Sequence, residues 1–384
     1  MHNMTQLATI ELPPHIAFSR SIEGDIAVNL SHSGGQSMSV NSLLAYCDGQ
    51  RQSMAEIDLS YASISGSKSL RQAISNFHHQ VFDQTWIKPK HVTTFAGAQE
   101  ALSCLYQLLI EPADEVIVMT PSYPSLQSMV GDLDGKLIPI PLEFKEQWKV
   151  DWHAFERAFS EKTSLVVINS PHNPTGMALT EEELAHVVSL CKQHDCYLLI
   201  DDVSHASQYQ KRMASRHIRY DKTVFINVMS KSLGLAGIRI GWAITDDKKL
   251  RNGLLACKAK ASICTSVIDE YLAELALDNC QRILARNNAI IETNIQKFNQ
   301  FLTQHPDISW HQPTSGILST IKFSKRILGN QSMESWAKDC AEKTGVLLLP
   351  TSLFGLTGPY CRLGLGQKNF EEGLNRLALY LKGL

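Results

Sequence analysis

The sequence predicts an α/β protein in which a mostly parallel central sheet carries helices on both faces and is joined to a smaller α+β domain. Short apolar runs, rich in β-branched residues, recur between residues 92 and 244 and are typical of strands buried on both faces. Helical patterns lie between several of these runs. Near residue 280 long helical patterns replace the alternation. We therefore expect a large domain over residues 46–280 and a small domain made of residues 1–45 together with 281–384.

The large sheet is predicted to have seven strands, at residues 92–95, 115–119, 136–140, 164–169, 196–201, 223–229 and 238–244. A helix is expected directly after the first strand, because its apolar residues recur at helical spacing. Another begins at Thr180, which forms a capping box with Glu183 three residues later. The small domain is expected to contain long helices, a short β segment near 314–322 and a C-terminal helix. Residues 1–45 read as an irregular arm that completes it.

Composition excludes several classes of function. The chain has 384 residues and a formal net charge of −2, so electrostatics gives no reason to expect nucleic acid or an anionic membrane as a partner. No apolar run approaches the roughly 18 residues of a membrane span, and the first residues do not resemble a secretory signal. Nine scattered cysteines without zinc-ligand spacing predict reduced thiols, no metal site and a cytoplasmic location.

Ligands of open α/β sheets bind outside the carboxyl ends of the strands, so the residues that follow each strand are candidates for a site. Ala98 and Gln99 open a helix after strand 92–95, where free N–H groups suit a phosphate, although a plain tight turn is the alternative. Tyr123 follows the next strand and can lie against a planar ligand or simply pack. Asn173 is held between two prolines, although Asn-Pro is also common in ordinary turns.

Two charged residues at strand ends require partners. Asp201 closes an apolar strand, and a buried carboxylate is costly unless a cation or a donor compensates it. Lys231 follows the strand at 223–229, where desolvation lowers the pKa of an amine and makes it a nucleophile for aldehydes. Arg239 follows a glycine-containing loop and can return to the same pocket to bind a phosphate through two parallel hydrogen bonds.

Pyridoxal 5′-phosphate would use all of these groups together. Its aldehyde suits Lys231, its pyridine nitrogen suits Asp201 and its phenolic oxygen suits Asn173. Its ring face suits Tyr123. The residues that suit its phosphate are Ala98, Gln99, Ser230 and Arg239. Each residue alone has an ordinary structural explanation, but the whole set in this order at strand ends predicts this cofactor.

Three segments resemble the class I/II aminotransferase family, fold type I of the pyridoxal phosphate enzymes: NPTG at 173–176, SKSLGLAGIRIGW at 230–242 and YASISGSKSLR at 61–71. The resemblance extends over nearly the whole chain. It implies that Tyr61 reaches the cofactor phosphate of a neighbouring subunit, so that the active form is a homodimer with shared sites. It also implies that Arg362 and Asn173 bind the α-carboxylate of an amino acid, and that the loop containing Gly34 lies over this substrate. Lys231 would then act as the general base at Cα.

Two positions depart from the family pattern. Ser204 stands where the family usually has a tyrosine that donates to the phenolic oxygen of the cofactor, and His205 follows it. Val228 stands where the family often has a phosphate-binding serine. The loop HSGGQSMSV, at 32–40, resembles the branch of the family that contains capreomycidine synthase, which cyclises a hydroxylated arginine.

These departures favour elimination and cyclisation of a hydroxylated arginine to a cyclic guanidino amino acid. The main alternative is an L-amino acid aminotransferase with a 2-oxo acid acceptor, and a less favoured one is a pyridoxal phosphate-dependent arginine oxidase. A non-catalytic regulator would normally carry a DNA-binding segment, for which the sequence shows no pattern. A guanidinium substrate would also need carboxylates at the pocket, and those of the N-terminal region are either such groups or plain solvated residues: Glu11, Glu23, Asp25 and Asp48.

Overall fold

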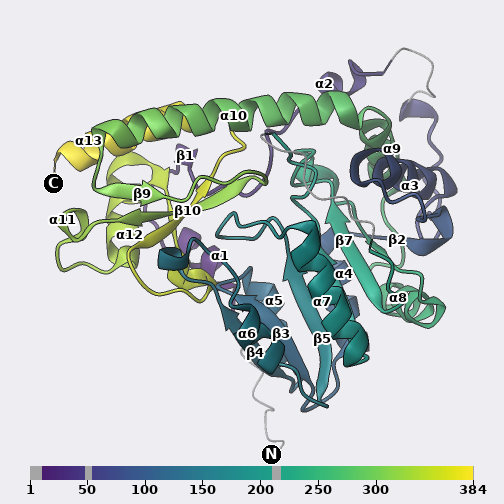
Figure 1. Ribbon diagram of the computed structural model, residues 1–384. Coiled ribbons are helices and arrows are strands. Elements are labelled where there is room, and N and C mark those ends of the chain that lie inside the picture. Colours follow the sequence, from purple (N-terminus) through teal and green to yellow (C-terminus); the bar gives the residue numbers. More distant parts are fainter. Residues whose placement is uncertain (1–10, 48–53, 210–217, 384) are drawn as a thin grey trace, which may run out of the picture.

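The computed structural model describes residues 11–47, 54–209 and 218–383. A seven-stranded sheet in the order β2-β8-β7-β6-β5-β3-β4 forms the centre of the molecule (Figure 1). Its strands are β2 Val92–Phe95, β3 Glu115–Thr120, β4 Lys136–Pro141, β5 Thr163–Asn169, β6 Tyr197–Asp201, β7 Thr223–Val228 and β8 Gly241–Ile244. All seven predicted strands are present, and the α/β class with a mostly parallel sheet is confirmed.

The direction of the strands brings the predicted site residues to one edge. Strands β7, β6, β5, β3 and β4 run parallel, whereas β8 is antiparallel to both of its neighbours. Asn169 pairs with Asp201 at the carboxyl ends of β5 and β6, and Asp201 pairs with Ile226 of β7. Because β8 is reversed, Arg239 just before its start lies at the same edge as Lys231 just after the end of β7.

Helices cover both faces of this sheet, as predicted. One apolar core contains side chains of α3 Lys68–Phe82, α7 Glu181–Gln193 and α9 Val267–Asp278 together with Ile168 and Ile200. The core on the opposite face contains α4 Ala98–Leu109, α5 Pro124–Gly131 and α8 Lys248–Lys260, packed against Val167 and Leu199. Successive residues of each central strand therefore enter different cores, which explains why these strands are apolar throughout.

Two strands of the sheet differ from the sequence expectation. The run at 238–244 is not one strand, because a 3-10 turn, Ala236–Ile238, is followed by Arg239 with a left-handed φ of 50° before β8 begins. Strand β4 is not buried on both faces, since it lies at the sheet edge and only Ile140 is buried. Prolines at positions 139 and 141 are tolerated there because an edge strand leaves one side unpaired.

The N-terminal region is more regular than predicted. It contains α1 Pro14–Arg20, β1 Val28–Asn29 and α2 Val40–Leu44. Strand β1 pairs in parallel with β11 Val346–Leu347, so this region contacts the C-terminal part of the chain. A short helix, α6 Trp152–Arg157, lies between β4 and β5 of the large sheet.

A second, antiparallel sheet in the order β12-β13-β10-β9 organises the C-terminal part. Its strands are β9 Ile308–Trp310, β10 Leu318–Phe323, β12 Leu349–Pro350 and β13 Tyr360–Gly364. Helices of this part are α11 Lys325–Leu328, α12 Met333–Thr344 and α13 Phe370–Lys382. The predicted β segment near 314–322 corresponds to β10, which starts later because Gly316 takes a positive φ of 81°.

Helix α10, Cys280–Gln304, runs from the large sheet to the smaller one (Figure 1). Its first turns place Ile283 and Leu284 in a core of the large sheet, and later turns place Ile291 and Ile295 in a separate core with the second sheet. The division near residue 280 stays a prediction, and its boundary falls at the start of this one continuous helix. In the described part of the chain no helix, α10 included, is long and apolar enough to cross a bilayer.

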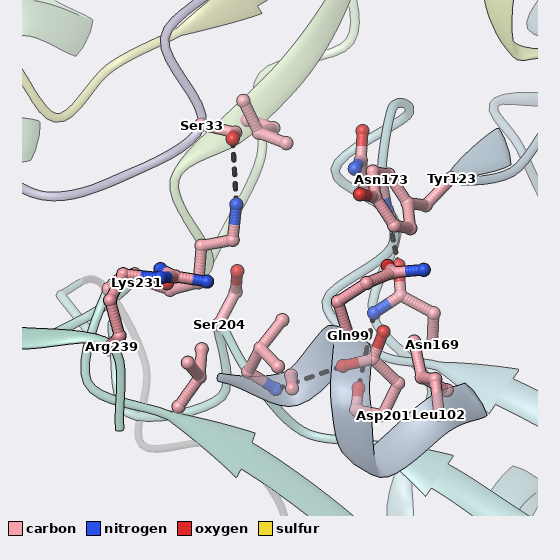
Figure 2. A pocket seen from close by; sticks show the side chains of 15 residues that line it. Ser33, Gln99, Leu102, Tyr123, Asn169, Asn173, Asp201, Ser204, Lys231 and Arg239 are labelled. Atoms are coloured by element: carbon pink, nitrogen blue, oxygen red, sulfur yellow. Dashed lines mark hydrogen bonds between the residues drawn. The ribbon is translucent and has the colours of Figure 1, made fainter. Parts of the chain in front are cut away.

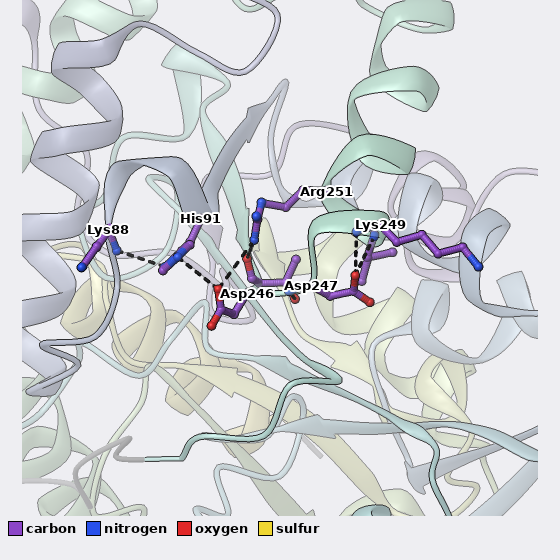
Figure 3. Close-up of polar contacts among 8 residues, drawn as sticks. Lys88, His91, Asp246, Asp247, Lys249 and Arg251 are labelled. Carbon is purple, nitrogen blue, oxygen red and sulfur yellow. Dashed lines mark hydrogen bonds and ion pairs between the residues drawn. The ribbon is translucent and has the colours of Figure 1, made fainter.

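A polar cluster stabilises the opposite edge of the large sheet (Figure 3). His91, at the start of β2, lies 3.2 Å from the Asp246 carboxylate, measured between Nε2 and Oδ1. The next residue, Asp247, caps α8 by accepting hydrogen bonds from the backbone N–H groups of Lys249 and Leu250. Tyr197, the first residue of β6, donates its hydroxyl to Asp247 at 2.7 Å. The cluster therefore connects strands and a helix at the edge away from the predicted site.

Candidate active site

A cavity of about 220 Å³ opens at the carboxyl edge of the large sheet (Figure 2). Predicted site residues that line it are Ala98, Gln99, Tyr123, Asn173, Asp201, Ser204, Ser230, Lys231 and Arg239. Further lining residues are Ser33, Leu102, Asn169, Val203, Val228 and Leu318. The structure thus brings together, in one place, residues that the sequence spreads over more than 200 positions.

Lys231 is the nucleophile candidate of this cavity. It follows β7 and donates a hydrogen bond from Nζ to the Ser33 hydroxyl at 2.7 Å (Figure 2). Burial and the nearby Arg362 guanidinium lower the pKa of Lys231 to about 8, an effect that Asp201 partly opposes. An amine with this pKa is partly unprotonated near neutral pH, which is the form that attacks carbonyl groups and accepts protons.

Asp201 supplies a buried negative charge. It ends β6 with 6% of its surface exposed, and burial raises the pKa of its carboxyl group to about 7. A backbone hydrogen bond from the Val203 N–H, at 3.2 Å, only partly compensates this cost. A carboxylate in this position lacks sufficient positive charge around it, so it suits a ligand that brings a protonated nitrogen.

Asn169 fixes the loop that carries Asn173. Its Nδ2 donates to the carbonyl oxygen of Asp201 at 3.1 Å, and its Oδ1 accepts from the Asn173 N–H at 2.7 Å. The amide of Asn173 is thereby held over the ends of β5 and β6. Sequence reasoning missed Asn169, although its position as the last residue of a buried strand was a usable signal.

The start of α4 forms an anion site. No side chain caps this helix, whose N-cap is Gly97 with a φ of 88°, so N–H groups of its first turn remain available. The Arg239 guanidinium packs directly against this glycine, since a Cβ atom there would lie 2.6 Å from NH2 of the arginine. Ser230 lines the same cavity. A helix start, a guanidinium and a hydroxyl together suit a phosphate group.

Arg362 brings a second guanidinium to the site from β13. It is 5% exposed, donates from NH1 to Asn173 Oδ1 at 3.1 Å and from NH2 to the Ser31 carbonyl at 2.8 Å, and stacks on Phe354 with 4.6 Å between Cζ and the ring centre. Its Nε is buried and has no hydrogen-bond partner. Burial lowers the pKa of Arg362 only to about 10, so it stays a cation with a donor free for a carboxylate.

Three predicted residues lie outside the cavity lining, and one of them is Arg362, which contacts the lining residue Asn173. Gly34 packs against the backbone near Lys231, where a Cβ atom would lie 2.7 Å from the Ser230 carbonyl oxygen. It is therefore a position of close backbone approach, and its neighbour Ser33 is the residue that faces the cavity. Tyr61 is 84% exposed and lies outside this pocket.

His15 of α1 is a second residue that sequence reasoning missed. Its ring centre lies 5.8 Å from that of Tyr123 and 6.1 Å from that of Phe354. Burial and the charges of Arg362 and Lys231 lower the pKa of His15 to about 4, so the imidazole is neutral at pH 7. The N-terminal region shows no periodic pattern from which this contact, or that of Ser33, could have been predicted.

Comparison with known proteins assigns the family. Residues 44–377 match the model of the family described as aminotransferase class I and II, and the chain therefore belongs to this family. It is similar to the arginine–pyruvate transaminase of Pseudomonas aeruginosa, at 26% identity over 83% of this chain and 81% of that protein.

Solved structures agree with this assignment. A pyridoxal phosphate-dependent aminotransferase from Streptococcus suis has a TM-score of 0.88 and 25% identity, with 98% of each chain covered. The pyridoxal phosphate-dependent cyclase OrfR has a TM-score of 0.89 at 20% identity over 99% of this chain and all of that one, which shows a shared fold. The cofactor of this enzyme is pyridoxal 5′-phosphate, and the fold is fold type I, as predicted.

The residues present fit this cofactor. Lys231 would hold its aldehyde, the insufficiently compensated Asp201 its pyridine nitrogen, and the start of α4 with Arg239 its phosphate. Tyr123 and Asn173 line the remaining walls of the cavity. Val228 is an apolar, buried part of the wall, so this position supplies no hydroxyl to a phosphate.

Proposed function

We propose that the protein is an L-amino acid aminotransferase that uses a 2-oxo acid as acceptor. The observation that carries this proposal is the unpaired, buried Nε of Arg362, which lies in the same site as the low-pKa amine of Lys231. A carboxylate bound by Arg362 is common to amino acids and 2-oxo acids. Both partners of a transamination can therefore use the same anchor.

Each residue of the chain has one task in this proposal. Arg362 binds the α-carboxylate, and Asn173, already bonded to it, keeps the guanidinium in place. Asp201 would hold a proton on the pyridine nitrogen of the cofactor, whose chemistry would supply an electron sink for the substrate α-carbon. Lys231 would take the proton from this carbon and pass it on, not back to the same carbon, in the half-reaction that turns the donor into a 2-oxo acid.

The test is to incubate the purified holoenzyme with single L-amino acids and either pyruvate or 2-oxoglutarate. Arginine is the first donor to try, because the similar transaminase from Pseudomonas aeruginosa is named for arginine and pyruvate. We expect a new amino acid derived from the acceptor, with an equal amount of a new 2-oxo acid. Consumption of a donor without any amination of an acceptor would refute transamination.

A second candidate is the cyclisation of a hydroxylated arginine. It is favoured by Ser204, which lines the cavity with 8% of its surface exposed at the position where the family usually has a tyrosine. A guanidinium side chain would require a carboxylate, and Asp201 is the only one among the described lining residues. Glu11, Glu23 and Asp25 are exposed, and Asp48 lies outside the described residues.

Mass spectrometry separates the remaining candidates. Incubation with a hydroxylated arginine and no acceptor would give a product lighter by one water if the enzyme is a cyclase. Uptake of oxygen with arginine would instead indicate an oxidase. Transamination predicts neither loss of water nor uptake of oxygen, and without a 2-oxo acid it stops after a single turnover.

We also propose a homodimer with shared sites. Tyr61 is 84% exposed and Leu59 is 74% exposed on the same loop, and neighbouring exposed apolar side chains can mark a surface that a partner covers. Gln99 and Arg239 of the phosphate site are exposed as well. A second copy that covers this rim would bury these side chains and would bring its own Tyr61 to the phosphate.

A further inference from the structure

Ser33 occupies an unusual place beside the reactive amine. It comes from the N-terminal region and lines the cavity, whereas Lys231 comes from the large sheet some 200 residues later. Its hydroxyl oxygen accepts the 2.7 Å hydrogen bond from Lys231 Nζ. Figure 2 shows this hydrogen bond between Lys231 and Ser33 as a dashed line.

We propose that Ser33 is a positioning residue that holds the Lys231 amine during proton transfer at the substrate α-carbon. The inference rests on the proposed function only in that Lys231 acts as the base. In this step the Cα–H bond breaks, an N–H bond forms at Nζ, and the electron pair stays with the carbon. The resulting ammonium needs an acceptor, and the hydroxyl of Ser33 is within reach.

The loop around Ser33 is fastened tightly enough for this task. Gly35 donates its N–H to the Lys231 carbonyl at 2.8 Å, which ties the loop to the lysine backbone itself. Gln367 donates from Nε2 to the Gly34 carbonyl at 2.8 Å and to the Gly35 carbonyl at 3.1 Å. Gly34 permits this close approach, since any side chain there would meet the Ser230 carbonyl. These contacts fix the backbone of the Ser33 loop against the backbone of Lys231.

The charges around Lys231 disfavour its ammonium form overall, so a neutral hydrogen-bond acceptor stabilises that form. The cations Arg362 and Arg239 disfavour an ammonium at Lys231, whereas the carboxylate of Asp201 favours it. The histidines nearby, His15 and His32, both have pKa values lowered mainly by burial, so they add little charge at neutral pH. Removal of the Ser33 hydroxyl would leave the Lys231 ammonium with one hydrogen-bond acceptor fewer. The pKa of the Lys231 amine would therefore fall further.

The first test measures the apoenzyme. The rate at which apoenzyme captures added pyridoxal phosphate, followed by visible absorption between pH 6 and 10, reports the fraction of unprotonated Lys231. Ser33→Ala is expected to move the midpoint of this profile down by roughly 0.5–1 pH unit. Ser33→Thr, which retains the hydroxyl, should restore it, and Ser37→Ala is the control because Ser37 is an exposed serine of the same loop. An unchanged midpoint in Ser33→Ala would overturn the proposal.

The second test follows exchange of the substrate α-hydrogen in D₂O by NMR, which requires no acceptor. Ser33→Ala should slow this exchange about tenfold, whereas its unfolding midpoint stays that of the parent. Equal exchange rates in the parent and in Ser33→Ala would refute the role of Ser33 and leave the proposed function intact. Exchange that occurs in the parent without any transamination would refute the proposed function instead.

Discussion

Asp201 is a residue of the site whose burial lowers the stability of the folded protein. In an unfolded chain its carboxyl group titrates near pH 3.9, whereas burial raises the pKa in the folded protein to about 7. Because the folded pKa is the higher one, folding disfavours the ionised form. The resulting penalty is absent below about pH 4, grows as the pH rises toward 7 and is complete above that.

We therefore predict that Asp201→Asn stabilises the apoprotein at pH 8 and has a smaller effect at pH 5. The amide keeps the size of the side chain but has no charge to bury. Melting temperatures of the apoprotein at both pH values test this, with the exposed Asp132→Asn as control. A lower melting temperature for Asp201→Asn at pH 8 would contradict the account, and the same variant should bind the cofactor more weakly.

Arg362 allows a prediction about the substrate. Arg362→Lys keeps the positive charge but loses the forked geometry that binds a carboxylate through two hydrogen bonds. We expect KM for the amino acid to rise about 100-fold, with a smaller change in kcat. Arg326→Lys, at a surface arginine with 84% of its side chain exposed, is the matched control. An unchanged KM in Arg362→Lys would remove this residue from the carboxylate site.

Residues of the site differ in how far the sequence reveals them. Lys231, Asp201, Asn173 and Arg239 follow or precede apolar strands, and parallel strands deliver such residues to one edge. Ser33 lines the same cavity, and His15 packs against Tyr123 of its lining, through contacts between distant segments. Local pattern contains no trace of such contacts, so these two residues emerge only from the structure.

Helix α8 provides a prediction at the scale of an element. Asp247 caps this helix through two backbone N–H groups (Figure 3). Asp247 also accepts a hydrogen bond from the Tyr197 hydroxyl. Asp247→Ala is expected to lower stability by about 1–2 kcal/mol because both interactions disappear. Chemical denaturation of the apoprotein measures this, and Lys249→Ala is the control because only the backbone of Lys249 serves the cap. Equal midpoints for Asp247→Ala and Lys249→Ala would contradict the assigned cap.

Elements were predictable where one physical cause dominates. The central strands are apolar on both faces because helices cover both, and the capping box of Thr180 and Glu183 is present at the start of α7. The prediction of one strand over 238–244 was wrong at its start, because an apolar run does not reveal the 3-10 turn or the left-handed backbone of Arg239. The prediction that β4 is buried on both faces was wrong because β4 lies at the edge of the sheet. An edge position depends on the order of the strands, which an apolar run does not reveal.

The proposed dimer yields a prediction at the scale of the whole molecule. Tyr61 would act in the active site of the partner protomer, whereas Lys231 acts in the active site of its own protomer. Tyr61→Ala therefore impairs the partner's site, and Lys231→Ala inactivates the site of the protomer that carries it. A hybrid dimer of the two variants has one site with both defects and one intact site. Mixing the unfolded variants and refolding them should restore up to about a quarter of the parent activity, since half of the random dimers are hybrids. No recovery, with dimers verified by light scattering, would contradict shared sites.

The architecture as a whole could be predicted because alternation of strands and helices leaves few arrangements. Side chains of α10 enter two separate cores, and no local pattern in the sequence indicates that one helix takes part in both. Residues 1–45 were predicted to form an irregular arm, but they contain regular elements and contribute to the site. Strand β1 completes a sheet with β11, and α1 and the Ser33 loop bring two side chains to the site.

The central claim is that Lys231 holds pyridoxal phosphate, and one measurement tests it directly. The holoenzyme, reduced with borohydride and digested, should carry the pyridoxyl phosphate mass on the peptide that contains Lys231. Lys231→Ala should lose both this label and the visible absorption band. A label on another lysine, such as the buried Lys258, or an unchanged band in Lys231→Ala would contradict the account.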